Sequence, residues 1–371
     1  MKGRLKELDI LRSVAVLAVI SIHITGGYLF NEKNSFALFW NQGMRFSVPL
    51  FFIISGFLLL NYDLENNNFS FKIYFKKRIS KIIIPYIFWT IFYTIYYMNN
   101  GILEIKNSIM GVFAYDVNFI KILLINTLQG TAAPHLYFIV IILQLYILYP
   151  FLFLLVKRNE KSLLAISFVV SLYFQIADYL YSYGLLMLPE GGFKYYGLMF
   201  FPWIFYFVLG MYNAIKIRSA ELKIKIFTME LFLLWILVYF MLIMDTKLSH
   251  TLATSAKPTI ILYSIISYYF LYSLSVNANI INKYVNNFIK WFSVQSFLIY
   301  FIHILVLCEI RLFIDRKSLY FISSSNIGMI LIFLSVISIS CVIVYIISKI
   351  PVIKLIGGVY SGTIKSTNYQ E

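Results

Sequence analysis

The sequence contains little charge and few cysteines. Only 13% of its 371 residues are charged, below the roughly 25% of a soluble globular domain, so that class is excluded. The two cysteines, Cys308 and Cys341, lie in apolar stretches and match neither a disulfide framework nor a metal site. A P-loop motif is also absent, which argues against nucleotide hydrolysis. We therefore interpret both cysteines as small apolar residues and expect no metal.

Long apolar runs occupy most of the chain. Hydrophobic residues make up 61% of it, and the mean hydropathy is +0.81. Runs of about 18 apolar residues predict transmembrane helices and exclude the alternating strands of a membrane barrel. We predict an all-α polytopic transmembrane bundle of about ten spans. The predicted spans are residues 8–30, 44–61, 79–98, 135–156, 163–183, 196–215, 226–244, 259–276, 291–313 and 327–348. A weaker apolar piece at 119–128 predicts an interfacial helix or a re-entrant segment.

The positive charge indicates membrane topology. The net charge is +15, but the lysines and arginines flank the predicted spans, so we expect no nucleic-acid partner. Most of them fall in alternate loops, which predicts that both termini are cytoplasmic and that the protein is multi-pass in the cytoplasmic membrane. Glu7 and Asp9 interrupt the basic N-terminus, which predicts an uncleaved first span. We predict one integral membrane domain over 1–355 and a short cytoplasmic tail over 356–371.

Arg12 and His23 are the main candidate functional residues. They are eleven residues apart in the first span, which places both side chains on one helix face, roughly 16 Å apart along the axis. An ionisable residue at membrane depth is costly and therefore suggests function. A core histidine bonded to a hydroxyl or carbonyl, and an arginine reaching to lipid headgroups, are the alternative interpretations. His303, in the ninth span, is expected at a similar depth to His23, although the sequence does not establish that these two spans are neighbours.

Further candidates lie in the second and fourth spans. Arg45 precedes a block with Pro49, Ser55 and Gly56, which predicts a kink or a close-packing point in the inner half of that span. His135 stands at the predicted outer start of the fourth span, where it has either a loop role or a role in binding.

A basic cluster precedes the third predicted span. Lys77, Arg78 and Lys81 are either ordinary cytoplasmic charge or a binding site for the phosphates of a nucleotide-like cofactor. Acids within spans are scarce, and Asp178 and Glu309 lie towards outer ends. This scarcity argues against a proton-relay pump and against a Ser-His-Asp arrangement. The alternative that the sequence leaves is a lone histidine that acts as general base or as a transient acyl acceptor.

Several of these segments together resemble the acyltransferase-3 family of integral membrane acyltransferases. The resemblance covers nearly the whole chain and is most specific in Arg12 with His23. Tyr137 stands where the family often has tryptophan. The other similar elements are residues 51–57, 78–86, 135–150, 207–210 and 296–303.

The resemblance implies transfer of an acyl group, commonly acetyl, from cytosolic acyl-CoA. The acceptor it implies is a hydroxyl of a cell-surface glycan or lipid-linked sugar. His23 would be catalytic, with His303 as a second candidate. Arg12, Lys77, Arg78 and Lys81 would hold the CoA end, and Arg45, Ser55 and His135 are candidate acceptor contacts. The other expected partners are membrane lipids and either a second copy of the chain or a polysaccharide-synthesis assembly.

Two other function classes stay open. A transporter or flippase for a polysaccharide or lipid-linked sugar would suit an aromatic, hydroxyl-rich interior. The scarcity of buried acids and the absence of a P-loop count against it. A sensor or assembly subunit would use the fold without chemistry, and the intact Arg12–His23 pair counts against that class.

Overall fold

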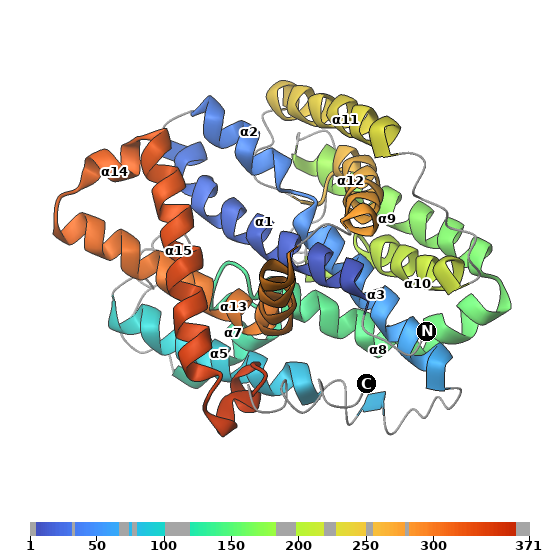
Figure 1. Cartoon of the computed structure of the whole chain (residues 1–371), viewed down its shortest axis with the longest axis horizontal. Coiled ribbons are helices and arrows are strands. Elements are labelled where there is room, and N and C mark those ends of the chain that lie inside the picture. The colour runs from blue at the N-terminus through green and yellow to red at the C-terminus, as the bar shows by residue number, and fades with distance from the viewer. Residues whose placement is uncertain are drawn as a thin grey trace. The chain divides into compact units, whose positions relative to one another are not determined.

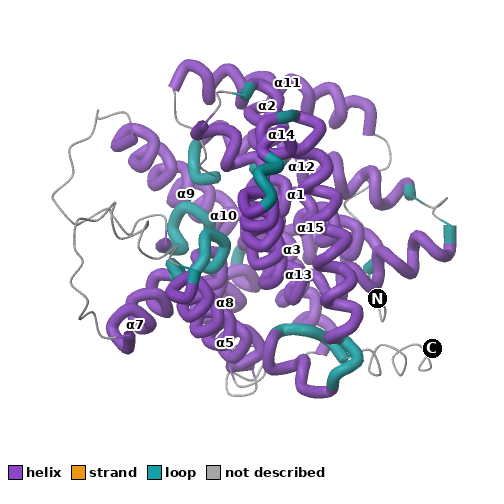
Figure 2. The backbone as a smooth tube through the Cα atoms, turned by 90° about the vertical axis from the view of Figure 1, so that its left-hand side faces the viewer, coloured by secondary structure: helices purple, strands orange, loops and turns teal. Residues whose placement is uncertain are grey.

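The computed structural model is helical wherever it describes regular structure. It describes residues 5–31, 34–66, 74–75, 80–100, 119–182, 198–218, 228–249, 255–278 and 282–360. Within these ranges Figure 2 shows helices and connecting loops and no strand. Helices satisfy their backbone hydrogen bonds internally, as a segment crossing lipid must. The prediction of an all-α polytopic bundle is therefore confirmed.

Within the same ranges, nine helical stretches are long and apolar enough to cross a membrane. They are α1 (Lys6–Asn31), α2 with α3 (Ser35–Gly43, Ser47–Asn66), α5 (Ser80–Asn99), α8 (Tyr137–Arg158), α9 (Glu160–Ser182), α11 (Thr228–Ser249), α12 (Pro258–Asn277), α13 (Lys283–Arg316) and α15 (Asn326–Ile347). The remaining elements are the short helices α7 (Phe119–Gln129), α10 (Ile204–Arg218), α14 (Tyr320–Ser324) and the 3-10 turn η4 (Pro351–Ile356).

The sixth predicted span begins later in the chain than the sequence suggested. We expected a helix over 196–215, but α10 begins only at Ile204 and has 15 residues. Pro202 and the turn residues beside it precede the helix, because proline disfavours helical geometry in the residue before it. The weaker apolar piece forms α7, whose 11 described residues span about 16 Å, less than the thickness of the bilayer core.

The second predicted span is two helices. The break falls at residues 44–46, between α2 and α3, whereas we expected the irregular point further along, near Pro49 and Ser55. Pro49 lies in the first turn of α3, where a missing N–H is tolerated because that group has no partner within the helix. The kink was one of two alternatives for the inner half, and there the structure shows no break, because α3 is continuous through Gly56.

The close-packing alternative for this span was correct. A Cβ atom on Gly56 would stand 2.0 Å from the Phe207 carbonyl oxygen of α10, and one on Gly210 would stand 1.9 Å from the Ile53 carbonyl oxygen of α3. Small residues allow such backbone approach between membrane helices. The two helices consequently lie directly against each other (Figure 1).

The chain divides into two compact units. Unit 1 comprises Met1–Phe69, Tyr149–Gly197 and Phe201–Tyr345, and unit 2 comprises Ser70–Leu148, Leu198–Phe200 and Ile346–Glu371. In unit 2, the Trp89 indole of α5 donates to the Ile356 carbonyl at 2.9 Å. In unit 1, α1 is central and packs against α2, α3, α12 and α13. Residues 361–371 of the predicted tail lie outside the described part of the chain.

Candidate functional site

The rings of His23 and His303 face each other in unit 1. Their centroids are 5.4 Å apart and their planes are tilted by 47°. His23 comes from α1 and His303 from α13, and these helices pack against each other (Figure 1). The sequence placed the two histidines at similar depth without establishing contact, and the structure supplies that contact. His303 is fully buried, whereas His23 is half-buried.

The backbone of α13 orients the His303 ring. The ring Nδ1 lies 2.6 Å from the Tyr300 carbonyl oxygen. A carbonyl can only accept, so Nδ1 carries the proton, and in the neutral ring Nε2 is then an acceptor. The Tyr300 ring also packs against His303, at 5.8 Å between centroids. His303 is therefore held in a tautomer whose Nε2 can accept a proton.

Arg311 is a residue that sequence reasoning did not propose as a candidate. Its Nη2 donates to the carbonyl oxygens of His23 and Ile24, each at 3.4 Å. Gly27 of α1 leaves room for it, because a Cβ there would stand 2.9 Å from that nitrogen. Arg311 lies about two turns after His303 on α13, and this spacing was the available signal.

Arg45 lies in the turn between α2 and α3, and the buried side-chain amide of Asn41 links it to α1. Its Nε and Nη2 donate to the Asn41 Oδ1 at 2.9 and 2.6 Å. The Asn41 Nδ2 donates in turn to the Thr25 hydroxyl at 2.9 Å and to the Ile22 carbonyl at 3.2 Å. Ile22 and Thr25 flank His23, so the bonds reach the α1 turn that carries the histidine. Arg45, through Asn41, and Arg311 are thus both hydrogen-bonded to the part of α1 around His23.

The other predicted residues are placed separately. Arg12 is half-buried on α1, which is continuous, so the eleven-residue spacing to His23 applies to a regular helix. Ser55 is half-buried on α3. Lys81 is exposed at the start of α5, in unit 2. Lys77 and Arg78 lie outside the described residues.

His135 belongs to unit 2. It is buried just before α8, and its ring meets the Tyr93 ring edge-on, with 5.4 Å between centroids and 80° between planes. Unit 1 thus brings together His23, His303, Arg45 and Arg311, and His135 stands in a separate aromatic setting.

A second buried polar cluster lies at the junction of α11 and α12. The Lys257 Nζ is 2.9 Å from Asp245 Oδ2 and donates to the Thr246 hydroxyl at 2.7 Å. The Tyr179 and Thr259 hydroxyls also donate to Asp245. Burial lowers the pKa of the Lys257 ammonium, and the bond to Asp245 acts in the opposite direction. Lys257 lies just before α12, outside the predicted spans, yet only 1% of its side chain is exposed.

Comparison with known proteins shows the family to which this chain belongs. The family described as "Acyltransferase domain" matches residues 5–349. A Bacillus subtilis protein named "Putative membrane-bound acyltransferase YfiQ" is 27% identical over 320 residues, which cover 81% of this chain and 80% of that protein. A Staphylococcus aureus protein named "Probable poly-beta-1,6-N-acetyl-D-glucosamine export protein" is 24% identical over 321 residues, covering 83% of each chain. No solved structure matches.

Proposed function

Because the chain belongs to the family of integral membrane acyltransferases along nearly its whole length, we propose that it is a membrane O-acyltransferase. It moves an acyl group, in the simplest case acetyl, from cytosolic acyl-CoA to a hydroxyl of a cell-surface or lipid-linked glycan. The observation that best supports the proposal is the contact between the rings of His23 and His303. His23 shares its face of α1 with Arg12.

His23 is the proposed catalytic residue. As a general base it takes the proton of the acceptor hydroxyl while that oxygen attacks the thioester carbonyl. The new C–O bond forms, the C–S bond breaks, and the CoA thiolate leaves and is protonated. Alternatively, His23 attacks the thioester and carries the acyl group as an acyl-imidazole until the hydroxyl displaces it. Both routes use the same nitrogen and leave the same products.

His303 and the nearby arginines have supporting roles in this proposal. The Tyr300 carbonyl fixes the His303 tautomer, so its Nε2 can accept a proton from His23 or orient the His23 ring. The cations of Arg45 and Arg311 stand near the ring, where positive charge would stabilise the oxyanion of the tetrahedral intermediate. A helix face with a base and nearby cations suits acyl transfer between an anionic donor and a neutral hydroxyl.

Donor and acceptor are proposed to enter at different ends of α1. Arg12, at the predicted cytoplasmic end, is one proposed contact for the phosphates of acyl-CoA. Lys77, Arg78 and Lys81 are the other candidate contacts for these phosphates. Arg45, Ser55 and His135 are the proposed acceptor contacts. The protein would act as a multi-pass protein of the cytoplasmic membrane.

The test is acyl transfer from radiolabelled acetyl-CoA to envelope glycan in membranes that contain the full chain. Native protein should incorporate label, His23→Ala should not, and added imidazole should restore part of the signal by occupying the space of the lost ring. The matched control is His250→Ala, at a position outside the described residues and assigned no role in the reaction. Full incorporation by both His23→Ala and His23→Gln, at equal protein levels, would refute the proposed catalytic role.

Polysaccharide export is the second candidate, because the Staphylococcus aureus relative carries that name. An exporter would need neither the donor nor a proton-accepting His23. Absence of label transfer by the native chain, with surface glycan reduced in cells lacking it and restored by His23→Ala, would favour export.

A further inference from the structure

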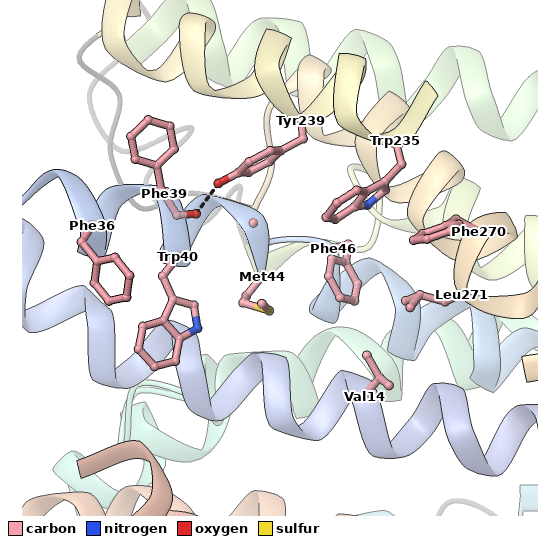
Figure 3. A pocket seen from close by; sticks show the side chains of 11 residues that line it. Val14, Phe36, Phe39, Trp40, Met44, Phe46, Trp235, Tyr239, Phe270 and Leu271 are labelled. Carbon is pink, nitrogen blue, oxygen red and sulfur yellow. Dashed lines mark hydrogen bonds between the residues drawn. The ribbon is translucent and has the colours of Figure 1, made fainter. Parts of the chain in front are cut away.

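An apolar pocket of about 430 Å³ lies within unit 1, between α1, α2, α11 and α12. This volume falls in the range of about 300 to 1,000 Å³ typical of small-molecule sites. Figure 3 shows the lining side chains spread lengthwise, with Phe36 and Trp40 at one end and Val14 and Leu271 at the other. An elongated apolar pocket suits a chain-like ligand better than a compact one.

The lining presents hydrocarbon, because several polar groups around it are already bonded. The Tyr239 hydroxyl donates to the Phe39 carbonyl at 2.7 Å, as drawn in Figure 3. The Trp235 indole donates to the Ser267 hydroxyl at 3.0 Å, and the Gly43 carbonyl accepts from Tyr263 at 2.8 Å. A sugar would find few hydrogen-bond partners among these groups, whereas a hydrocarbon needs none.

The rim of the pocket lies among residues that would contact lipid. Phe36 and Phe39 are 41% and 39% exposed, on a helix that forms part of a predicted span. In a bilayer these side chains meet lipid, so a lipid chain can enter from the side without crossing water. The surrounding medium therefore supplies ligands of the required chemistry.

A cation stands beside this rim. The Lys247 Nζ, exposed in the last turn of α11, lies 5.4 Å from the centroid of the Phe39 ring. A lysine next to an apolar slot matches a lipid whose head carries phosphate, because the ammonium pairs with the phosphate while the chain is buried. The predicted topology places this end of α11 on the outer side.

The pocket also contacts the turn that leads to the histidine pair. Met44 and Phe46 line it, and they flank Arg45 in the break between α2 and α3. Val14 is nine residues before His23, about half a turn around α1, so the pocket and the His23 ring lie on opposite faces of that helix. A lipid bound here would leave only its head group free to approach the histidines.

We propose that this pocket holds the hydrocarbon chain of the lipid that carries the acceptor sugar, with its phosphate at Lys247. The inference rests on the proposed acyltransferase function and narrows its acceptor to a lipid-linked sugar. The lipid anchor confines the sugar to the membrane surface near α1, which raises its local concentration for transfer.

The experiment uses the full-length protein in nanodiscs and a polyprenyl phosphate that carries a diazirine on its chain. Mass spectrometry should map the label to residues 36–46, 235–239 and 270–271. The variant Val14→Trp, which fills the pocket, should remove this label. The matched control Val342→Trp, at a position 57% exposed on α15, should keep it. Lys247→Gln should weaken labelling about fivefold, as expected for one cation beside a phosphate. Lys317→Gln, also exposed and predicted on the outer side, should not.

The competing outcomes are distinct. Equal competition by phosphatidylcholine, or label that Val14→Trp does not reduce, would overturn the acceptor-lipid site. If the native chain also transfers acetyl to a lipid-linked sugar and Val14→Trp does so equally well, the lipid site fails while the function stands. If the probe labels the pocket but the native chain transfers no acyl group, the proposed function fails and the acceptor assignment falls with it.

Discussion

Unit 1 contains two polar clusters of opposite character. In one, Lys257 and Asp245 bring together opposite charges 2.9 Å apart, with hydroxyls bonded to both. In the other, His23 and His303 bring together two rings that can each gain a proton, near the cations of Arg45 and Arg311. Opposite charges that neutralise each other hold helices in place. Two imidazole rings that face each other supply no such neutralising pair, so we place the proposed chemistry at the second cluster.

The largest expected effect comes from the histidine cluster. His23→Ala should lower the acyl-transfer rate by about 10²- to 10⁴-fold, the usual contribution of a general base. Its thermal midpoint in detergent should stay near the native value, because the half-buried ring leaves little unfilled space. A variant that unfolds early and regains its rate at low temperature would place His23 among the structural residues instead.

Substitutions in the Lys257–Asp245 ion pair should lower stability and leave the acyl-transfer rate unchanged, the reverse of the result expected for His23→Ala. Lys257→Met leaves the Asp245 carboxylate without its cation and should destabilise the fold by about 3 to 5 kcal/mol. The double variant Lys257→Met/Asp245→Leu should recover much of this loss, since it removes both charges. Unfolding midpoints measure the stability, and acyl transfer per folded molecule should be retained. Loss of transfer in a folded double variant would contradict a purely structural role.

A substitution at Asn41 tests whether Arg45 contributes to acyl transfer or only to stability. Asn41→Leu removes two hydrogen bonds to a buried guanidinium, each of a kind worth about 1.5 to 3 kcal/mol, and should lower both the unfolding midpoint and the transfer rate. Asn326→Leu is the matched control, because Asn326 accepts from Asn34 in an exposed pair. A lower unfolding midpoint with an unchanged transfer rate would mean that Arg45 stabilises the fold and has no role in transfer.

The smallest effect is expected at a less buried ion pair. Lys216 and Glu160 are 2.8 Å apart, but 14% and 23% of their side chains are exposed, against 1% for Lys257. Lys216→Met should therefore destabilise the fold by about 0 to 1 kcal/mol, measured by the same unfolding experiment. A loss of stability as large as that caused by Lys257→Met would mean that the difference in burial does not determine how much each ion pair contributes to stability.

The sequence was informative where a single helix determines the answer. Arg12 and His23 share a face of α1 because helix periodicity depends only on local spacing. The positions of most spans followed from apolar runs, since the bilayer requires about 20 such residues. The family resemblance also held. Catalytic roles, the acyl donor, the acceptor and the orientation of the termini stay predictions.

The sequence was uninformative about features that depend on contacts between segments far apart in the chain. The pairing of His23 with His303, separated by most of the chain, depends on how α1 packs against α13. Arg311 and Asp245 were missed for the same reason, because their partners lie on other helices. The break before α3 was misplaced because Pro49 lies in a first turn, where proline is tolerated, and composition alone does not show where a turn begins.

The glycine contact between α3 and α10 has a consequence for the protein's biogenesis. The described part of α10 has 15 residues and is about 22 Å long, less than the hydrocarbon layer of about 30 Å that a helix must cross when it enters lipid alone. Because α3 is synthesised first, the backbone surface beside Gly56 is available when α10 leaves the ribosome. The short helix is therefore expected to insert by docking onto a completed neighbour, and Gly56→Ala should delay membrane integration of the second half of the chain.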